Sequence, residues 1–252
     1  DAVRDALGDP VLDANGRFVT DNASPRQLAF ETDGIIWDVG VMWKPSDRTS
    51  FVATYGHRYG SDTYTGSFNY QPNERTGITV SAYDTVSGFG NALNDSLAAM
   101  PTQFRSSRNP LTGDLNSCAF AQSGGFCLNN AQRNTSSAAF RSRGVSASIV
   151  NQGGSLDSGI AVGYDRRKFL ASGLGAQPEL AGLVDENYYI AGFVGKELDR
   201  RSRIESNVYG TYNDPGFALA PDGYGFGANA AYYRQLWRGL SLSAAAGIDT
   251  YK

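Results

Sequence analysis

The stretch that decides the fold of this chain reads GIIWDVGVMWKP and occupies residues 34–45. Successive side chains of a β-strand point to opposite faces, so residues of one parity share a face. The stretch therefore predicts a strand with one strongly apolar face and one face of different character. The apolar parity carries Ile35, Trp37, Val39, Val41 and Trp43, and the other parity carries Asp38, Gly40, Met42 and Lys44.

The same alternation returns in nine later segments, most of them about 9 to 11 residues long, which is the length that crosses a bilayer when the strand is tilted. The pattern predicts an all-β fold, an antiparallel up-and-down transmembrane β-barrel with about ten strands in this stretch. The nine segments are SFVATYGHRYG, TYTGSFNYQ, GITVSAYDT, RGVSASIV, SGIAVGYD, NYYIAGFVGKE, RIESNVYGTY, YGFGANAAYYRQLW and LSLSAAAGIDTY.

The connections between these segments fall into two classes that alternate along the chain. KPSDRT, QPNERT, NQGGSLD, LDRRSR and WRG are compact, whereas the other links run over about 87–139, 166–185 and 213–222, with GSDT as one short exception. Up-and-down strands place alternate links at opposite ends. Transmembrane β-barrels typically have short turns at one end of the barrel and long loops at the other.

The apolar parity could face either hydrocarbon or the core of a soluble protein. Aromatic residues lie toward strand ends, where indole and phenol rings prefer the lipid headgroup layer, and this favours the membrane. A large soluble β-sandwich or closed soluble barrel is the alternative. The predicted lipid-facing aromatic belt consists of Trp37, Trp43, Tyr55, Tyr59, Tyr64 and Tyr70.

Composition sets further limits. Net charge is −3, so no basic surface attracts nucleic acid, and no apolar run reaches the roughly 18 residues of a transmembrane helix. Cys118 and Cys127 are the only cysteines, and they enclose a Gly- and Ser-rich segment that suits a loop disulfide in an oxidising compartment. A metal pair is the weaker alternative, because the single histidine is far away in sequence, and we expect neither a metal nor any other cofactor.

The stretch WDVGVMWKPSDRTSFVATYGHRYGSDTYTGSFNYQPNERT, within residues 34–84, resembles the repeated W-x-x-G-x-x-W-x-P-S-x-R-T … G-x-R-Y-x-G segment of the outer-membrane β-barrel family associated with PEP-CTERM and exopolysaccharide systems of Gram-negative bacteria. The motif is a structural signature of strand, tight turn and strand. The resemblance implies a barrel fold and a location in the bacterial outer membrane. It implies no biochemical activity.

The predicted organisation has two parts. Residues 1–33 form an outer loop with a β-hairpin, signalled by Asn15-Gly16, and residues 34–252 form the barrel region with a long outer loop over 87–139. If the compact links are periplasmic, the first strand begins at the outer face of the membrane and the last strand ends there. Lipid forbids an open sheet edge, so we expect the barrel to have 12 or more strands, unless a further strand lies within 1–33 or 87–139.

The polar parity carries the functional prediction. If these polar side chains face a hydrated lumen, they would line a weakly selective passage for small hydrophilic solutes or a sugar chain. The alternative is a small barrel whose interior is filled by the same side chains and which conducts nothing. In the seventh strand, Tyr188 and Ile190 compete with Tyr189, Ala191 and Phe193 for the lipid side. The predicted lumen-lining residues are Asp38, Lys44, Arg58, Thr65, Asn69, Thr79, Ser81, Glu205, Asn207, Asn229, Gln235 and Asp249.

The loop over 87–139 is predicted to fold inward and narrow the passage. Its constriction residues would be Asp95, Arg105, Arg108 and Asp114, and NALNDSLAAM within it would form a short helix capped by Asn91 or Asn94. A surface lid or partner-docking loop is the competing interpretation.

We expect that this protein is not an enzyme. The single His57 shares the parity of Tyr55 and so belongs to the aromatic belt, and a carboxylate dyad among Asp84, Asp95 and Asp114 has no spacing that requires it. The sequence therefore favours an outer-membrane channel or export conduit. The alternative is a non-conducting structural or docking subunit of an envelope complex, with outer-membrane lipid and envelope proteins as partners. Neither the transported solute nor the oligomeric state follows from the sequence.

Overall fold

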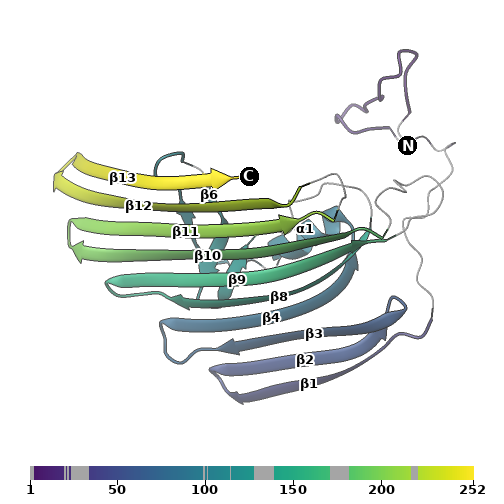
Figure 1. Ribbon diagram of the computed structural model, residues 1–252, viewed down its shortest axis with the longest axis horizontal. Coiled ribbons are helices and arrows are strands. Elements are labelled where there is room, and N and C mark those ends of the chain that lie inside the picture. Colours follow the sequence, from purple (N-terminus) through teal and green to yellow (C-terminus); the bar gives the residue numbers. More distant parts are fainter. Residues whose placement is uncertain are drawn as a thin grey trace.

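A computed structural model of the chain describes residues 3–19, 21, 23, 34–98, 100, 102–113, 115–127, 139–170, 182–216 and 221–252. Figure 1 shows one broad curved sheet, with a second, smaller sheet and a helix behind it. We call the broad sheet the wall and the small one the inner sheet.

The wall is a ten-stranded antiparallel sheet whose strands pair in sequence order. All ten predicted strands are present, and the predicted all-β, antiparallel, up-and-down fold with about ten strands in this stretch is confirmed. The strands are β1 (Trp37–Ser46), β2 (Thr49–Arg58), β3 (Ser61–Tyr70), β4 (Thr76–Ser87), β8 (Phe140–Asn151), β9 (Leu156–Phe169), β10 (Val184–Asp199), β11 (Ser202–Asp214), β12 (Gly223–Trp237) and β13 (Leu240–Tyr251).

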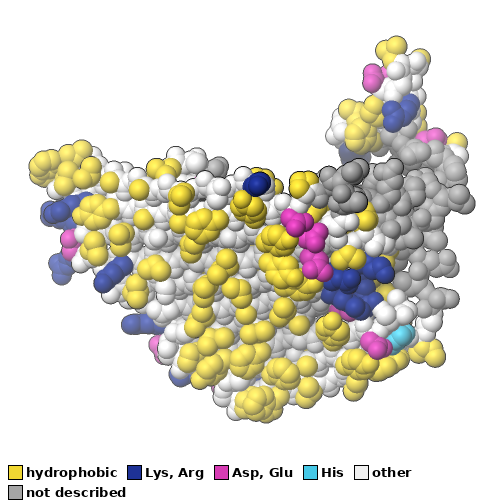
Figure 2. Space-filling view, viewed as in Figure 1, with side chains coloured by type: hydrophobic (Ala, Val, Ile, Leu, Met, Phe, Trp, Pro, Cys, Tyr) yellow, Lys and Arg dark blue, Asp and Glu magenta, His cyan; other side chains and the backbone are white. Residues whose placement is uncertain are grey.

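The register of the wall gives each face a single chemical character. Trp37 lies opposite His57, Val39 opposite Tyr55 and Val41 opposite Ala53, so the apolar parity of β1 continues into β2. The same face then carries exposed apolar side chains on the later strands (Figure 2). We call this the outer face. Exposed members include Tyr64, Val145, Ile149, Ile160, Val162, Tyr188, Ile190, Val208, Phe226 and Ile248.

The opposite, inner face carries the polar parity and holds the inner sheet. The polar cross-strand pairs Thr54–Thr65, Ser81–Ser146 and Asn207–Asn229 lie on it. Within the described residues, the free edges of β1 and β13 are not paired with any strand. The prediction of a barrel with 12 or more strands stays a prediction.

The turn between β2 and β3 is tighter than the sequence indicated. Tyr59 and Gly60 both have positive φ, 57° and 69°, as a two-residue type I′ hairpin requires. Tyr59 therefore lies in the turn and not in the strand, and the strand placement assumed for it in the aromatic belt was wrong. Glycine meets this conformation without strain, whereas tyrosine does not, so the neighbouring pairing must hold Tyr59 in place.

One junction in the wall is incomplete. β3 and β4 pair only from Gly66–Ala82 to Tyr70–Ile78, although both strands extend further toward the end that carries the long links. Beyond Gly66 the two strands do not pair with each other.

The link between β4 and β8 contains structure that the sequence only partly revealed. The predicted short helix is present as α1 (Phe89–Ala98), but it begins before Asn91 and Asn94, so neither residue caps it. The three strands of the inner sheet, β5 (Arg105–Arg108), β6 (Leu115–Ala121) and β7 (Gly124–Cys127), were not predicted. They are too short and too irregular in polarity to show an alternating pattern.

The N-terminal segment 3–19 repeats every eight residues. The backbone N–H of Val3 donates to Val19 O, that of Val19 to Val11 O and that of Val11 to Val3 O, which closes a ring of three hydrogen bonds. The predicted hairpin exists at the bridge Leu12–Phe18, but only Gly16 of its turn has a positive φ, so the turn is not type I′. The division of the chain at residue 33 stays a prediction, because 24–33 lie outside the described residues.

No helix among the described residues is long and apolar enough to span a membrane.

Candidate functional site

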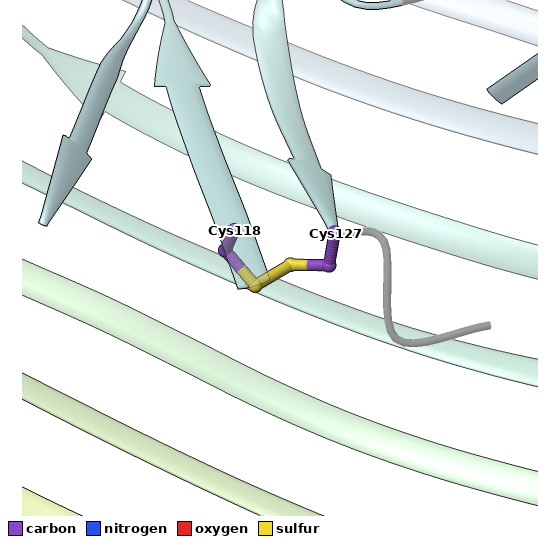
Figure 3. The surroundings of a disulfide bond; sticks show 2 residues. All are labelled: Cys118 and Cys127. Carbon is purple, nitrogen blue, oxygen red and sulfur yellow. A yellow bond between two sulfur atoms is a disulfide. The ribbon is translucent and has the colours of Figure 1, made fainter. Parts of the chain in front are cut away.

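The inner sheet lies against the inner face of the wall and crosses its strands (Figures 1 and 3). Thr79 Oγ1 on β4 donates to Ser123 O at 3.1 Å, and Gln152 Nε2 donates to Phe120 O at 3.2 Å. Gln122 Nε2 donates to Glu74 O at 2.6 Å. These hydrogen bonds fix the β6–β7 turn at the end of the wall that carries the compact turns.

Gly77 on β4 makes this close approach sterically feasible. A Cβ at this position would lie 1.8 Å from Gln122 O, which no side chain can tolerate. A glycine in the interior of a strand commonly marks such a close approach of two backbones. The inner sheet is therefore built for this place on the wall.

An apolar cluster joins the inner sheet to β8, β9 and β10. The rings of Phe120 and Phe193 lie 4.8 Å apart between centroids, and both side chains are buried. Val150, Ala161 and Ala191 from the wall complete the contact together with the two cysteines. Each fully buried large apolar side chain contributes about 1.5–3 kcal/mol, so the loop is held mainly by hydrophobic burial.

The predicted disulfide is present. Cys118 on β6 lies directly opposite Cys127 on β7, and their sulfur atoms are bonded (Figure 3). The bond sits inside the apolar cluster on the inner face. It ties the β6–β7 hairpin across a sequence separation of 9 residues.

The cluster also resolves the ambiguity in β10. Tyr189 and Phe193 are 9% and 6% exposed on the inner face, whereas Tyr188 and Ile190 are 46% and 45% exposed on the outer face. Both parities of β10 are apolar because the inner one packs against the loop.

Arg105 on β5 brings the loop into ionic contact with the wall. Its guanidinium forms ion pairs with Asp157 on β9 and with Glu205 on β11, and it lies 5.6 Å from the ring centroid of Phe193. A cavity of about 310 Å³ opens beside it. Among the polar residues lining this cavity are Arg105, Arg108, Arg203, Glu205, Asn207 and Tyr233.

The remaining predicted constriction residues are placed differently. Arg108 lines the same cavity and its guanidinium donates to Gly113 O. Asp95 is an exposed residue of α1, and no contact among the described residues joins it to Arg105. Asp114 lies outside the described residues.

The register places the predicted lumen-lining residues on the inner face, Lys44 by alternation past the last regular pair of β1. Several of them bond to one another, to the loop or to other residues of the wall, including the ion pair of Arg58 with Asp38 and the hydrogen bond from Tyr209 on β11 to Asp249. The residues concerned are Asp38, Lys44, Arg58, Thr65, Asn69, Thr79, Ser81, Glu205, Asn207, Asn229, Gln235 and Asp249.

The predicted belt residues other than Tyr59 lie exposed on the outer face: Trp37, Trp43, Tyr55, Tyr64 and Tyr70. His57 shares this face, and its Nδ1 lies 3.1 Å from a carboxylate oxygen of Asp62.

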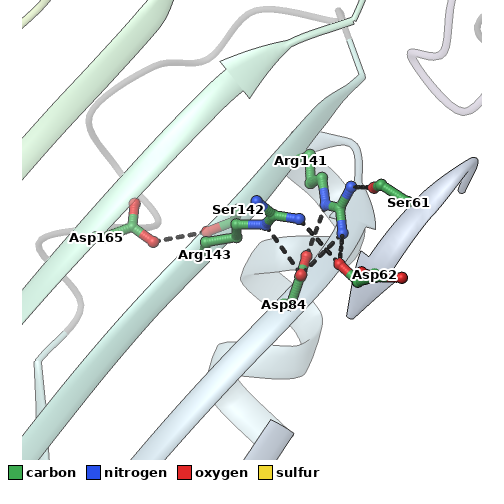
Figure 4. Close-up of polar contacts among 7 residues, drawn as sticks. All are labelled: Ser61, Asp62, Asp84, Arg141, Ser142, Arg143 and Asp165. Carbon is green, nitrogen blue, oxygen red and sulfur yellow. Dashed lines mark hydrogen bonds and ion pairs between the residues drawn. The ribbon is translucent and has the colours of Figure 1, made fainter. Parts of the chain in front are cut away.

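Sequence reasoning missed two clusters of paired charges. Asp165 and Arg167 form a buried ion pair on β9, at 3.1 Å, and Asp165 also accepts hydrogen bonds from Tyr83 and Ser142. Asp84 on β4 accepts from Arg141 and Arg143 of β8 at 2.7–2.9 Å (Figure 4), so it is a partner of two arginines and not of a second carboxylate. The partners of Asp84 lie 57 and 59 residues away, and nothing in the local sequence signals them.

No group of three or more His, Cys, Asp or Glu side chains within the described part of the chain could hold a metal ion.

No family model matches the chain, and no curated protein matches it. Among solved structures, it is similar to OmpT (in-vitro folded), an outer membrane protein of Vibrio cholerae, with a TM-score of 0.41 and 7% identity. That match covers 85% of this chain and 53% of the other, so this chain spans about half the length of that protein.

Proposed function

We propose that this chain forms wall strands of a bacterial outer-membrane β-barrel that passes small hydrophilic solutes, or a polysaccharide during export, and that the inner sheet narrows this passage. The observation that carries the proposal is the opposite chemistry of the two faces of one sheet. Large apolar side chains stay exposed on the outer face of nine of the ten wall strands, all except β4, while polar side chains and the loop occupy the inner face. Hydrocarbon outside and water inside is the arrangement that satisfies both faces.

Strand length agrees with this proposal. The shortest wall strands have 10 residues, which at about 3.3 Å per residue and a tilt of about 40° span roughly 25 Å, the height of the apolar band of outer-membrane barrels. The free edges of β1 and β13 need further strands in lipid, because unpaired backbone groups cannot be solvated there.

Arg105 and its partners support a constriction. The loop carries a cation into the interior and places it against Asp157 and Glu205 of the wall, beside a polar cavity. Opposite charges across a narrow passage make it selective for small polar solutes over apolar ones.

A second candidate is favoured by the apolar cluster. Phe120, Phe193, Val150 and the disulfide form a dry contact on the inner face of β8–β10, and a lumen filled in this way could belong to a non-conducting structural or docking subunit of an envelope complex.

Conductance across planar lipid bilayers separates the two candidates. A channel gives stable current steps, and deletion of residues 103–127 increases the step about twofold or more because the obstruction is gone. Arg105→Gln shifts ion selectivity toward cations, since Asp157 and Glu205 stay behind, whereas Arg234→Gln on the outer face leaves selectivity unchanged. Absence of current from both the intact and the deleted protein would instead support the scaffold.

A further inference from the structure

Four cations face one another on β8 and β9 at the end of the wall that carries the long links. Arg143 lies directly opposite Arg166, and Arg141 lies directly opposite Lys168. Like charges directly opposite each other on neighbouring strands destabilise a sheet. Two such pairs in succession require anions nearby.

All four side chains belong to the outer face. They continue the parity of Val145 on β8 and of Tyr164 on β9, which are opposite each other further along the same strands. Figure 2 shows Lys and Arg side chains gathered at this end of the apolar surface, next to acidic ones.

The carboxylates of the protein satisfy only part of this charge. Arg141 and Arg143 share Asp84, whose side chain is fully buried, and Arg166 lies 3.4 Å from Glu186 (Figure 4 shows the Asp84 group). Lys168 has no carboxylate partner among the described residues. The four positive charges of this group are therefore paired with only two carboxylates, those of Asp84 and Glu186. Asp62 on one side of the group bonds to His57, and Asp214 on the other side lies opposite Glu186.

The four cations differ in what they can still bind. Arg141 is tied down by Asp84, Ser61 and the carbonyl oxygen of Asp62, and its side chain is 12% exposed. The side chains of Arg143 and Arg166 are 31% and 39% exposed, and Lys168 is exposed. Arg141 thus serves the structure, while the other three can reach a ligand.

Two observations fix the depth of this group in a membrane. The first is a row of rings directly beside it: Tyr164 and Tyr188 lie 4.8 Å apart between centroids, and Tyr188 and Tyr212 lie 6.1 Å apart. Such aromatic rows lie at the level of the lipid headgroups.

The second is the incomplete junction between β3 and β4. Their pairing stops at Gly66–Ala82, and beyond it Arg141 and Arg143 donate to the carbonyl oxygen of Asp62 on β3 at 2.9 and 3.0 Å. Two neighbouring strands that no longer pair with each other cannot lie in hydrocarbon, because every backbone N–H and C=O group there needs a hydrogen-bond partner within the protein. The group must lie at headgroup depth.

We propose that Arg143, Arg166 and Lys168 bind the phosphate of a glycolipid headgroup in the outer leaflet. This inference rests on the proposed outer-membrane location. Guanidinium groups bind phosphate oxygens through two parallel hydrogen bonds, and the added anion relieves the two like-charge pairs. Tyr64, 5.8 Å below the guanidinium of Arg143, and Tyr164 offer ring surface to the sugar and the acyl chain. Continuity with the apolar face favours a lipid over a soluble phosphate.

The test is retention of a phosphorylated glycolipid by the full-length chain. The protein is inserted into phosphatidylcholine vesicles that contain diphosphorylated lipid A, extracted with mild detergent, and the lipid A bound per chain is measured by native mass spectrometry. The variant Arg166→Gln/Lys168→Gln is compared with Lys196→Gln/Arg234→Gln, which removes two cations from the same face at its other end. Protease protection of the strands in vesicles reports insertion separately.

The wild type and the Lys196→Gln/Arg234→Gln variant should retain lipid A, and Arg166→Gln/Lys168→Gln should bind it about tenfold more weakly. Dephosphorylated lipid A should be lost from all of them. Equal retention by both double variants, or of dephosphorylated lipid A, overturns the proposal. Displacement of lipid A by millimolar inorganic phosphate makes the site one for a soluble anion and overturns its lipid part. A wild type that does not insert at all refutes the outer-membrane proposal, and this inference with it.

Discussion

Phe120 of the loop packs against Phe193 of the wall, with ring centroids 4.8 Å apart, so one contact joins two segments that lie 73 residues apart in the sequence. The inner sheet keeps its place through this contact and those around it. Its removal offers the most direct test of how the loop is held.

Phe120→Ala should lower the free energy of unfolding by about 3–5 kcal/mol, because a fully buried ring leaves a cavity against β9 and β10. Chemical denaturation of the reconstituted protein measures the loss. Phe104→Ala is the control, since Phe104 is 47% exposed and should cost less than about 0.5 kcal/mol. Equal losses in both variants would contradict the packing described for Phe120.

Reduction of Cys118–Cys127 should destabilise the loop. The loop-closure model gives about 2–3 kcal/mol for a ring of this size. Limited proteolysis should then cut within 115–127 in the reduced protein and not in the oxidised one. The double variant Cys118→Ser/Cys127→Ser should be cut with or without reductant, and a reductant effect in that variant would show that the sensitivity has another origin.

Gly77→Ala should displace the β6–β7 turn from β4. The new methyl group would collide with Gln122 O, and overpacking of this kind costs about 1–3 kcal/mol. Hydrogen exchange of the amides around Gln122 should rise. Gly88→Ala is matched to it, because no atom lies within 4 Å of the added Cβ, and exchange there should stay as in the wild type. Unchanged exchange in Gly77→Ala would show that the contact is not tight.

Val162→Arg should impair insertion into lipid vesicles. Val162 is exposed near the middle of the outer face, and an arginine at the bilayer midplane of a β-barrel costs about 2–4 kcal/mol. Thr65→Arg on the inner face is the control and should fold almost normally, because that side is hydrated. If the two arginines have the same effect on the free energy of folding in lipid, hydrocarbon does not contact the outer face.

The pKa of Asp13 lies below the ordinary aspartate value because the backbone N–H of Arg17 donates to its carboxylate, as does that of Asn15. A depressed folded-state pKa means that the carboxylate stabilises its turn fully above about pH 3.9, and that this stability is lost as the pH falls through the depressed value. The amide proton shifts of Asn15 and Arg17 should titrate together below pH 3.9. Asp13→Ala should abolish the titration, and a midpoint at the ordinary value would contradict these hydrogen bonds.

The alternating strands could be predicted because their signal is local. A strand exposes its parity to whatever lies on each side, so Trp37, Val39 and Val41 indicate an apolar surrounding without knowledge of any partner. The turn at Tyr59-Gly60 was harder, since tyrosine at positive φ is rare and the sequence offered no Asn-Gly or Asp-Gly signal.

The candidate site was predicted only in outline. The disulfide followed from the spacing of the two cysteines, whereas the inward path of the loop with Arg105 was one of two interpretations that the sequence left open. The partners of Arg105, Asp157 and Glu205, were not predicted. Asp95 was chosen for its charge and lies instead on the exposed side of α1. A charge in a loop does not reveal where the loop folds back.

The sequence by itself determined the ten wall strands, their order and the chemistry of the two faces, because these depend on neighbours two residues apart and on short turns. Only the tertiary structure decided that Phe193 packs inward beneath Phe120, that Asp84 pairs with Arg141 and Arg143, and that β3 parts from β4. The first two features join segments far apart in the chain, and the third separates two consecutive strands. Such contacts depend on the curvature of the wall and the path of the loop, and a period of two residues contains no information about either.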